Sequence, residues 1–139
     1  MNKRKVEKML PTALKGLKDD ACGILKDGKI DKNFRGQIAA FGAAVTMGSF
    51  KSAIAFFGAK GGSDVERQNL VRLMYYVTHN EHWMQTEPIE DEEKRKKKEA
   101  EKIVEEVIGM DVSQARTARE EYLNASLAIK LALNAFHLE

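Results

Sequence analysis

The residues best suited to chemistry in this chain are two histidines, His79 and His82, within the run His-Asn-Glu-His-Trp. Two histidines three residues apart on a helix can share a face and bind a cation. The pair lacks the spacing of four found in the zinc metalloprotease motif, and the remaining histidine, His137, stands near the end of the chain. The ordinary interpretation is a histidine pair at a helix end, and the alternative is a metal site with hydrolytic activity.

Other groupings typical of catalysis are absent from the sequence. Cys22 is the single cysteine, and no histidine lies nearby to activate its thiol, so we expect a core or boundary residue in a reducing compartment. Gly58, Gly61 and Gly62 are not followed by the Lys-Ser or Lys-Thr of a phosphate-binding loop. We therefore expect a protein that is not an enzyme, with no catalytic residue, no metal ligand and no cofactor.

Charge is distributed unevenly along the 139 residues. Residues 1–72 contain 14 Lys and Arg against 7 Asp and Glu, whereas residues 73–139 contain 9 against 14, so the halves carry +7 and −5. This asymmetry suits a protein whose positive half contacts a polyanion and whose negative half contacts a basic protein. Helical proteins often have such an asymmetry without any partner. The sequence has no recognisable signal peptide and no apolar run near the roughly 20 residues of a membrane span, so we expect a cytoplasmic protein without membrane contact.

Composition and hydrophobic spacing predict an all-α fold, a single domain over residues 1–139 formed by a bundle of about five or six helices. The chain has two prolines and no alternating strand pattern bounded by turn residues. Because Pro11 suits a first helical turn, we expect residues 1–9 to be a loose basic arm or a separate short helix. We further expect a loop at 85–92 and treat 138–139 as the remnant of a tag.

The stretch Phe34–Lys60 is the expected centre of the core, because it has a single charge between Ile38 and Phe57. It predicts two helices that meet at a corner, where Gly48 takes the left-handed conformation and Ser49 caps the second helix. Glycine or alanine at positions 36, 39, 40, 42, 43 and 44 gives the first of these helices a bare surface that another helix can approach closely. The side chains expected to point inward are Ile38, Phe41, Ala44, Val45, Phe50, Ala53, Ile54 and Phe57.

Two other helical segments are indicated by charge and spacing. An apolar stripe over 10–24 predicts a first long helix that ends near Lys26, and Asp31 is the expected N-cap of the helix after it. In 90–102 acidic residues precede basic ones by about four positions, which favours a solvated helix with i,i+4 ion pairs.

Two capping boxes predict the starts of two further helices. Ser63 and Glu66 form the first, and Asp111 and Gln114 form the second. The helix after Ser63 is expected to turn Leu70, Leu73, Met74 and Val77 inward and to fray near Trp83.

The central stretch contains two motifs: Arg-Gly-x-Ile-Ala-Ala-Phe-Gly-Ala-Ala at 35–44, and Gly-Ser-Phe-x-x-Ala-Ile-Ala-Phe-Phe at 48–57, followed by Lys60. These motifs resemble the small all-helical subunit of type III-B CRISPR-Cas (Cmr) effector complexes. The resemblance implies a non-catalytic subunit in antiviral defence that stacks in several copies and helps hold guide RNA and target RNA through backbone contacts. It implies as partners the other Cmr subunits, including the repeated backbone subunit, copies of the chain itself, and both RNAs.

Under this resemblance, the RNA-binding residues belong to the basic N-terminal half, because recognition of an A-form backbone calls for spread cations and not a pocket. The predicted RNA-binding residues are Lys15, Lys18, Arg35, Lys51, Lys60 and Arg67. The alternative for Arg35 is an ion pair with Asp31, four residues back. Lys3, Arg4, Lys5 and Lys8 are further candidates for phosphate contact, and the block 94–98 is next in line. The alternative function is a helical protein–protein adaptor without nucleic-acid contact.

Overall fold

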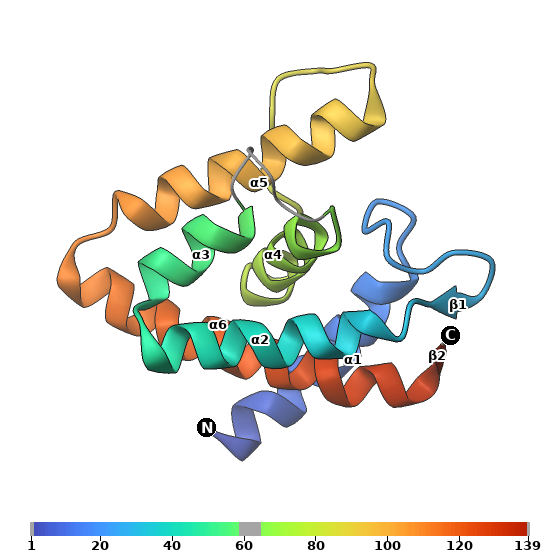
Figure 1. Cartoon of the computed structure of the whole chain (residues 1–139), viewed down its shortest axis with the longest axis horizontal. Coiled ribbons are helices and arrows are strands. Elements are labelled where there is room, and N and C mark those ends of the chain that lie inside the picture. Colours follow the sequence, from blue (N-terminus) through green and yellow to red (C-terminus); the bar gives the residue numbers. More distant parts are fainter. Residues whose placement is uncertain (1, 59–64, 139) are drawn as a thin grey trace.

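Apolar residues at helical spacing form six α-helices within residues 2–58 and 65–138, the part of the chain that the computed structural model describes (Figure 1). The helices are α1 Lys3–Lys18, α2 Asn33–Met47, α3 Phe50–Gly58, α4 Val65–Thr78, α5 Glu92–Ile108 and α6 Val112–Ala132, and α6 continues into a short 3₁₀ helix, η1 Leu133–Ala135. Two-residue strands, β1 Lys29–Ile30 and β2 His137–Leu138, pair in parallel. The predicted all-α single-domain bundle is thus confirmed. Leu138, which the sequence analysis treats as part of a tag remnant, belongs to the small sheet.

The helix at the centre of the bundle is α4, which contacts each of the other five helices. Figure 1 shows it nearly end-on, with the other helices arranged around it. Its buried residues include Leu70, Leu73, Met74 and Val77, as predicted. The stretch 34–60 supplies much of the core from α2 and α3, but the helix on which the others pack is α4.

Three polar residues of α4 are buried as well, and Arg72 is the most enclosed of them, with 1% of its surface exposed. Its guanidinium donates to Glu99 Oε1 on α5 at 3.0 Å and to the backbone carbonyls of Ala21 at 2.6 Å and Cys22 at 3.1 Å. It also donates to Asn69 Oδ1 at 3.0 Å. Arg72 therefore joins α4, α5 and the segment that follows α1.

Cys22 lies in the core beside this network and has no exposed surface. Burial raises the pKa of its thiol to about 12. Because only the thiolate reacts with alkylating agents, we expect iodoacetamide at pH 8 to label the native chain at least about a thousandfold more slowly than the chain in guanidinium chloride. Mass spectrometry measures the rate. Complete labelling of the native chain at the rate of the unfolded chain would contradict the buried position.

The first helix differs from its prediction at both ends. α1 runs without a break from Lys3 through Pro11 to Lys18, in place of a loose arm or separate helix over 1–9. Its start is held because Asn2 Oδ1 accepts from Lys5 N at 3.1 Å and Val6 is buried in the core. Its end comes earlier than Lys26 because Arg72 binds the carbonyls of residues 21 and 22.

The predicted caps agree with the structure in most places. Ser49 Oγ accepts from Ser52 N at 3.1 Å, and the capping box of Asp111 with Gln114 is present. Asp31 Oδ1 accepts from Asn33 N at 2.8 Å, but the residue directly before α2 is Lys32, which makes no side-chain cap. Gly48 is an exception, because its φ of −121° is not left-handed. The capping box predicted at Ser63 and Glu66 depends on residues outside the described part of the chain.

The close helix packing predicted at the small residues of α2 is not found among residues 2–58 and 65–138. A Cβ placed on Gly36 or Gly42 would have no atom within 4 Å, and Ala39, Ala40 and Ala43 are exposed. Close approach occurs at Gly16 instead, where a Cβ would lie 2.6 Å from Leu73 Cδ1. The small-residue face of α2 (36, 39, 40 and 43) is therefore an outer surface of the bundle.

Candidate nucleic-acid interface

The exposed side of α1 carries a line of four cations: Arg4, Lys8, Lys15 and Lys18. Their spacings of four, seven and three residues place them on one face of a helix, opposite the buried Val6, Ala13 and Leu17. At 1.5 Å per residue this line is about 21 Å long. We call these four residues the α1 ridge, and they include two of the six predicted RNA-binding residues.

Within the part of the chain that the structure describes, Arg4, Lys8 and Lys18 make no ion pair. Lys15 Nζ lies 2.7 Å from Glu81 Oε2, and 66% of the Lys15 side chain is exposed. The hydrogen bond to Glu81 raises the pKa of Lys15, so its ammonium remains charged. Because exposed ion pairs contribute little and are screened by salt, Glu81 does not prevent Lys15 from contacting another anion.

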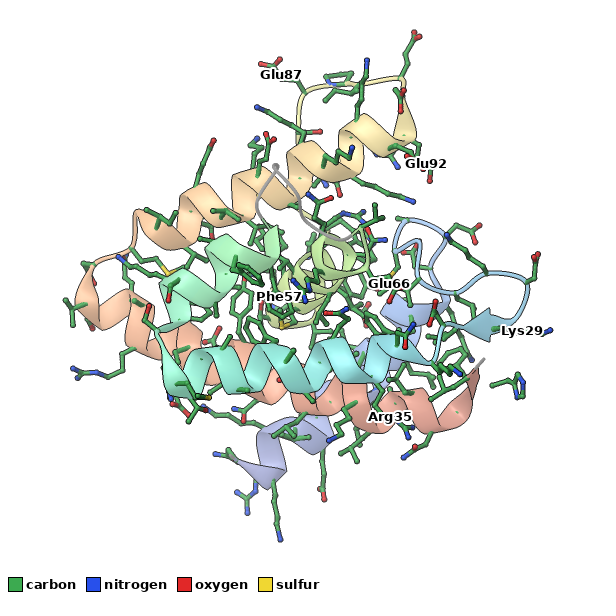
Figure 2. The ribbon with its side chains drawn as sticks, in the orientation of Figure 1. Lys29, Arg35, Phe57, Glu66, Glu87 and Glu92 are labelled. Atoms are coloured by element: carbon green, nitrogen blue, oxygen red, sulfur yellow. The ribbon has the colours of Figure 1, made fainter. Side chains whose placement is uncertain are left out.

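Arg35 lies apart from the α1 ridge, in the first turn of α2 beside the C-terminal part of α6 (Figure 2). Its Nη2 donates to Asn134 Oδ1 at 3.1 Å. The ion pair with Asp31, our alternative for this residue, is not formed. Arg35 remains exposed and lines a groove between α1, α2 and α6.

Lys51 and Arg67 both have contacts inside the bundle. Lys51 Nζ donates to the carbonyls of Ile108 at 3.0 Å and Met110 at 2.6 Å, and so binds the C-terminus of α5. Arg67 Nε donates to Gln37 Oε1 at 2.7 Å, and its guanidinium lies 5.1 Å and 5.2 Å from the ring centroids of Phe56 and Phe57. The sixth predicted residue, Lys60, lies outside the described residues.

The basic block 94–98 of α5 is largely neutralised by neighbouring acids, as its sequence predicts. Arg95 and Lys96 contact Glu92 at 4.0 Å and 3.3 Å, and Lys98 contacts Glu101 at 3.7 Å. Of the five predicted residues that it describes, the structure therefore brings only Lys15 and Lys18 together, and it adds Arg4 and Lys8 to them. Helical spacing predicts that the four cations of the α1 ridge share a face once Pro11 is placed inside a single helix.

The histidines do not share a helix face, because α4 ends at Thr78. His79 stacks on Tyr75 with ring centroids 3.7 Å apart, and its Nδ1 lies 2.9 Å from Thr78 Oγ1. His82 Nδ1 faces the carbonyl of His79 at 3.0 Å. No group of three or more His, Cys, Asp or Glu in the described ranges could hold a metal ion.

Comparisons with models of known protein families, with curated proteins and with solved structures find no match for this chain. Among residues 2–58 and 65–138, no helix is both long and apolar enough to cross a membrane. The candidate interface is therefore defined by its own geometry, that of a helix with one buried apolar face and one exposed cationic face.

Proposed function

We propose that this chain is a non-catalytic, all-helical subunit of a guide-RNA effector complex of the type III-B CRISPR-Cas (Cmr) kind, acting in antiviral defence. In this role it contacts the backbone of the guide and target RNA through the α1 ridge. The observation that carries the RNA contact is the line of four exposed cations on one face of α1. The kind of complex is proposed because the two motifs at 35–44 and 48–57 resemble the small subunit of Cmr complexes.

The shape of the α1 ridge suits a nucleic-acid backbone better than a small ligand. An A-form duplex is recognised mostly by its shape and by contacts to phosphate and 2′-hydroxyl groups, and the base sequence in a guide-RNA complex is read by pairing. Cations spread over about 21 Å can each contact a different phosphate. Each contact is then weak by itself, and the binding depends strongly on salt.

The proposal places contacts between copies of the chain on the small-residue face of α2. Its residues at 36, 39, 40 and 43 are exposed and lack long side chains, so a second helix can approach their backbone closely. This face and the α1 ridge belong to different helices, which lets one copy contact RNA and a neighbouring copy at the same time.

A helical protein–protein adaptor is the second candidate, and exposed apolar side chains favour it. Met47 at the end of α2 is 88% exposed, and Val112 at the start of α6 is 77% exposed. A protein partner that covered these side chains would remove their apolar surface from water. This function would leave the α1 ridge without a role, which is the reason we rank it second.

Reversing the charge of all four ridge residues to glutamate is expected to weaken binding of a short RNA duplex by at least about tenfold at low salt. The slope of log affinity against log salt should fall by roughly 0.7 to 0.9 per lost phosphate contact, because fewer counterions are released. Fluorescence anisotropy of the labelled duplex over a range of KCl concentrations measures both quantities. Circular dichroism checks that the variant is folded.

A matched control reverses four exposed cations elsewhere and so produces the same change in net charge. The control residues are Lys26, Lys29, Lys32 and Arg116. If this control loses as much RNA binding as the ridge variant, net charge and not the α1 ridge is responsible. If the ridge variant binds as well as the parent at every salt concentration, the proposed RNA contact is wrong.

The complex itself is tested by affinity purification of the tagged chain from its native host. We expect other Cmr subunits and a short CRISPR-derived RNA to co-purify with it. Recovery of protein partners without any RNA would favour the adaptor.

A further inference from the structure

A groove of about 520 Å³ lies between the start of α1, the start of α2 and the end of α6. Its floor is apolar and is formed by Val6, Leu127 and Leu131. Leu131 is 50% exposed, so the floor is open to water. Leu127 and Leu131 are one helical turn apart and lie on the same face of α6.

The rim of the groove is cationic and combines residues from three helices, Lys3, Arg35 and Lys130. The sequence gives no sign that these residues meet, because 127 positions separate the first from the last. Lys3 and Lys130 make no ion pair within the described residues. A single carboxylate, that of Glu7, also lines the groove.

Arg35 is held in place before any partner arrives. Its Nη2 donates to Asn134 Oδ1 at 3.1 Å, which leaves the other guanidinium N–H groups available. A guanidinium positioned in this way can form paired hydrogen bonds with a carboxylate at a small cost in side-chain entropy.

We propose that this groove binds an acidic amphipathic helix of a neighbouring protein subunit. Apolar side chains of that helix pack on Leu127 and Leu131, and its carboxylates contact Lys3, Arg35 and Lys130. The inference deepens the proposed function by naming the chemistry of a protein partner, and it relies on that function for the view that the partner is another subunit of the complex. The groove and the α1 ridge use different residues, so the two sites can be tested separately.

The apolar floor is the reason for a protein partner and not RNA. A phosphate backbone would satisfy the cations but would leave Leu131 exposed to water, whereas an apolar side chain would bury it. Helix-in-groove complexes work in the same way: apolar side chains one turn apart provide most of the binding free energy, and charged groups provide specificity.

The test uses the full-length chain and a fluorescent helical peptide on the order of 16 residues, with leucines at i and i+4 and glutamates beside them. One control peptide has glutamine in place of every glutamate, and another has alanine in place of every leucine. We expect the acidic peptide to bind and each control peptide to bind at least about tenfold more weakly. Equal binding of the acidic and glutamine peptides would overturn the proposal.

Variants of the chain locate the binding. R35E combined with K130E, and separately L131S, should each weaken binding of the acidic peptide by at least about tenfold. Charge reversal at Arg116 and the change V112S, at the other end of α6, should change it by less than twofold. Equal losses in these controls would overturn the groove as the site.

The RNA duplex separates failure of this inference from failure of the proposed function. If the groove variants lose RNA binding and keep peptide binding, the groove is a nucleic-acid site and the inference is wrong. If the variant of the α1 ridge keeps RNA binding while the groove variants lose the peptide, the inference stands and the proposed RNA contact fails.

Discussion

Replacing Arg72 with methionine is expected to lower the free energy of unfolding by about 3 to 5 kcal/mol, a loss typical of breaking a buried ion pair on one side. The variant leaves the Glu99 carboxylate, which is 6% exposed, without its nearest guanidinium at 2.9 Å. It also removes the donors to the carbonyls of Cys22, which is buried, and Ala21, which is partly buried. Chemical denaturation followed by circular dichroism measures the change.

Arg95→Met is the matched control, because Arg95 binds the same carboxylate from outside. Its Nε lies 3.4 Å from Glu99 Oε2, and 38% of its side chain is exposed. Since partly exposed pairs contribute little, we expect a loss below about 1 kcal/mol. The double variant R72M/E99L should lose less than R72M alone, because both buried charges are then removed together. Similar losses in R72M and R95M would show that burial of the pair is not what stabilises it.

Arg72 also shows why part of the fold could not be predicted. The apolar spacing of α4 identified its inward residues correctly, since Leu70, Leu73, Met74 and Val77 are buried. Arg72 lies on the opposite side of α4 from these residues and is buried too, because α4 contacts each of the other five helices. Asn69 is a partner only three positions away. Glu99 is 27 positions away and the carbonyls of Ala21 and Cys22 are about 50, so no local pattern could reveal those partners.

The presence of the helices could be predicted from local sequence signals, whereas the set of side chains that lie free on the surface could not. The caps at Ser49 and Asp111 depend on neighbouring residues and were predicted correctly. Whether a cation is exposed or engaged depends on distant segments, as when Lys51 binds carbonyls 57 and 59 positions away. The five predicted RNA-binding residues that the structure describes are all cations but do not share one surface, and the groove at Arg35 is formed by three helices.

Gly16 and Gly42 are expected to respond in opposite directions to the same substitution. In Gly42→Ala the new methyl group meets no atom within 4 Å, so the higher helix propensity of alanine should stabilise the chain by up to about 1 kcal/mol. In Gly16→Ala the same gain is available, but the methyl group would lie 2.6 Å from Leu73 Cδ1 and 2.9 Å from Tyr76 Cδ1. We therefore expect a net loss of about 1 to 3 kcal/mol, the usual cost of overpacking.

The sign at Gly16 depends on whether Leu73 and Tyr76 can move. Leu73 has no exposed surface, and Tyr76 is 3% exposed and stacks on Trp83 with ring centroids 4.3 Å apart, so neither has free space beside it. Thermal unfolding of the two alanine variants at equal protein concentration compares them directly. A melting temperature for Gly16→Ala at or above that of Gly42→Ala would mean that α1 and α4 separate readily, and the close contact between them would then not be a source of stability.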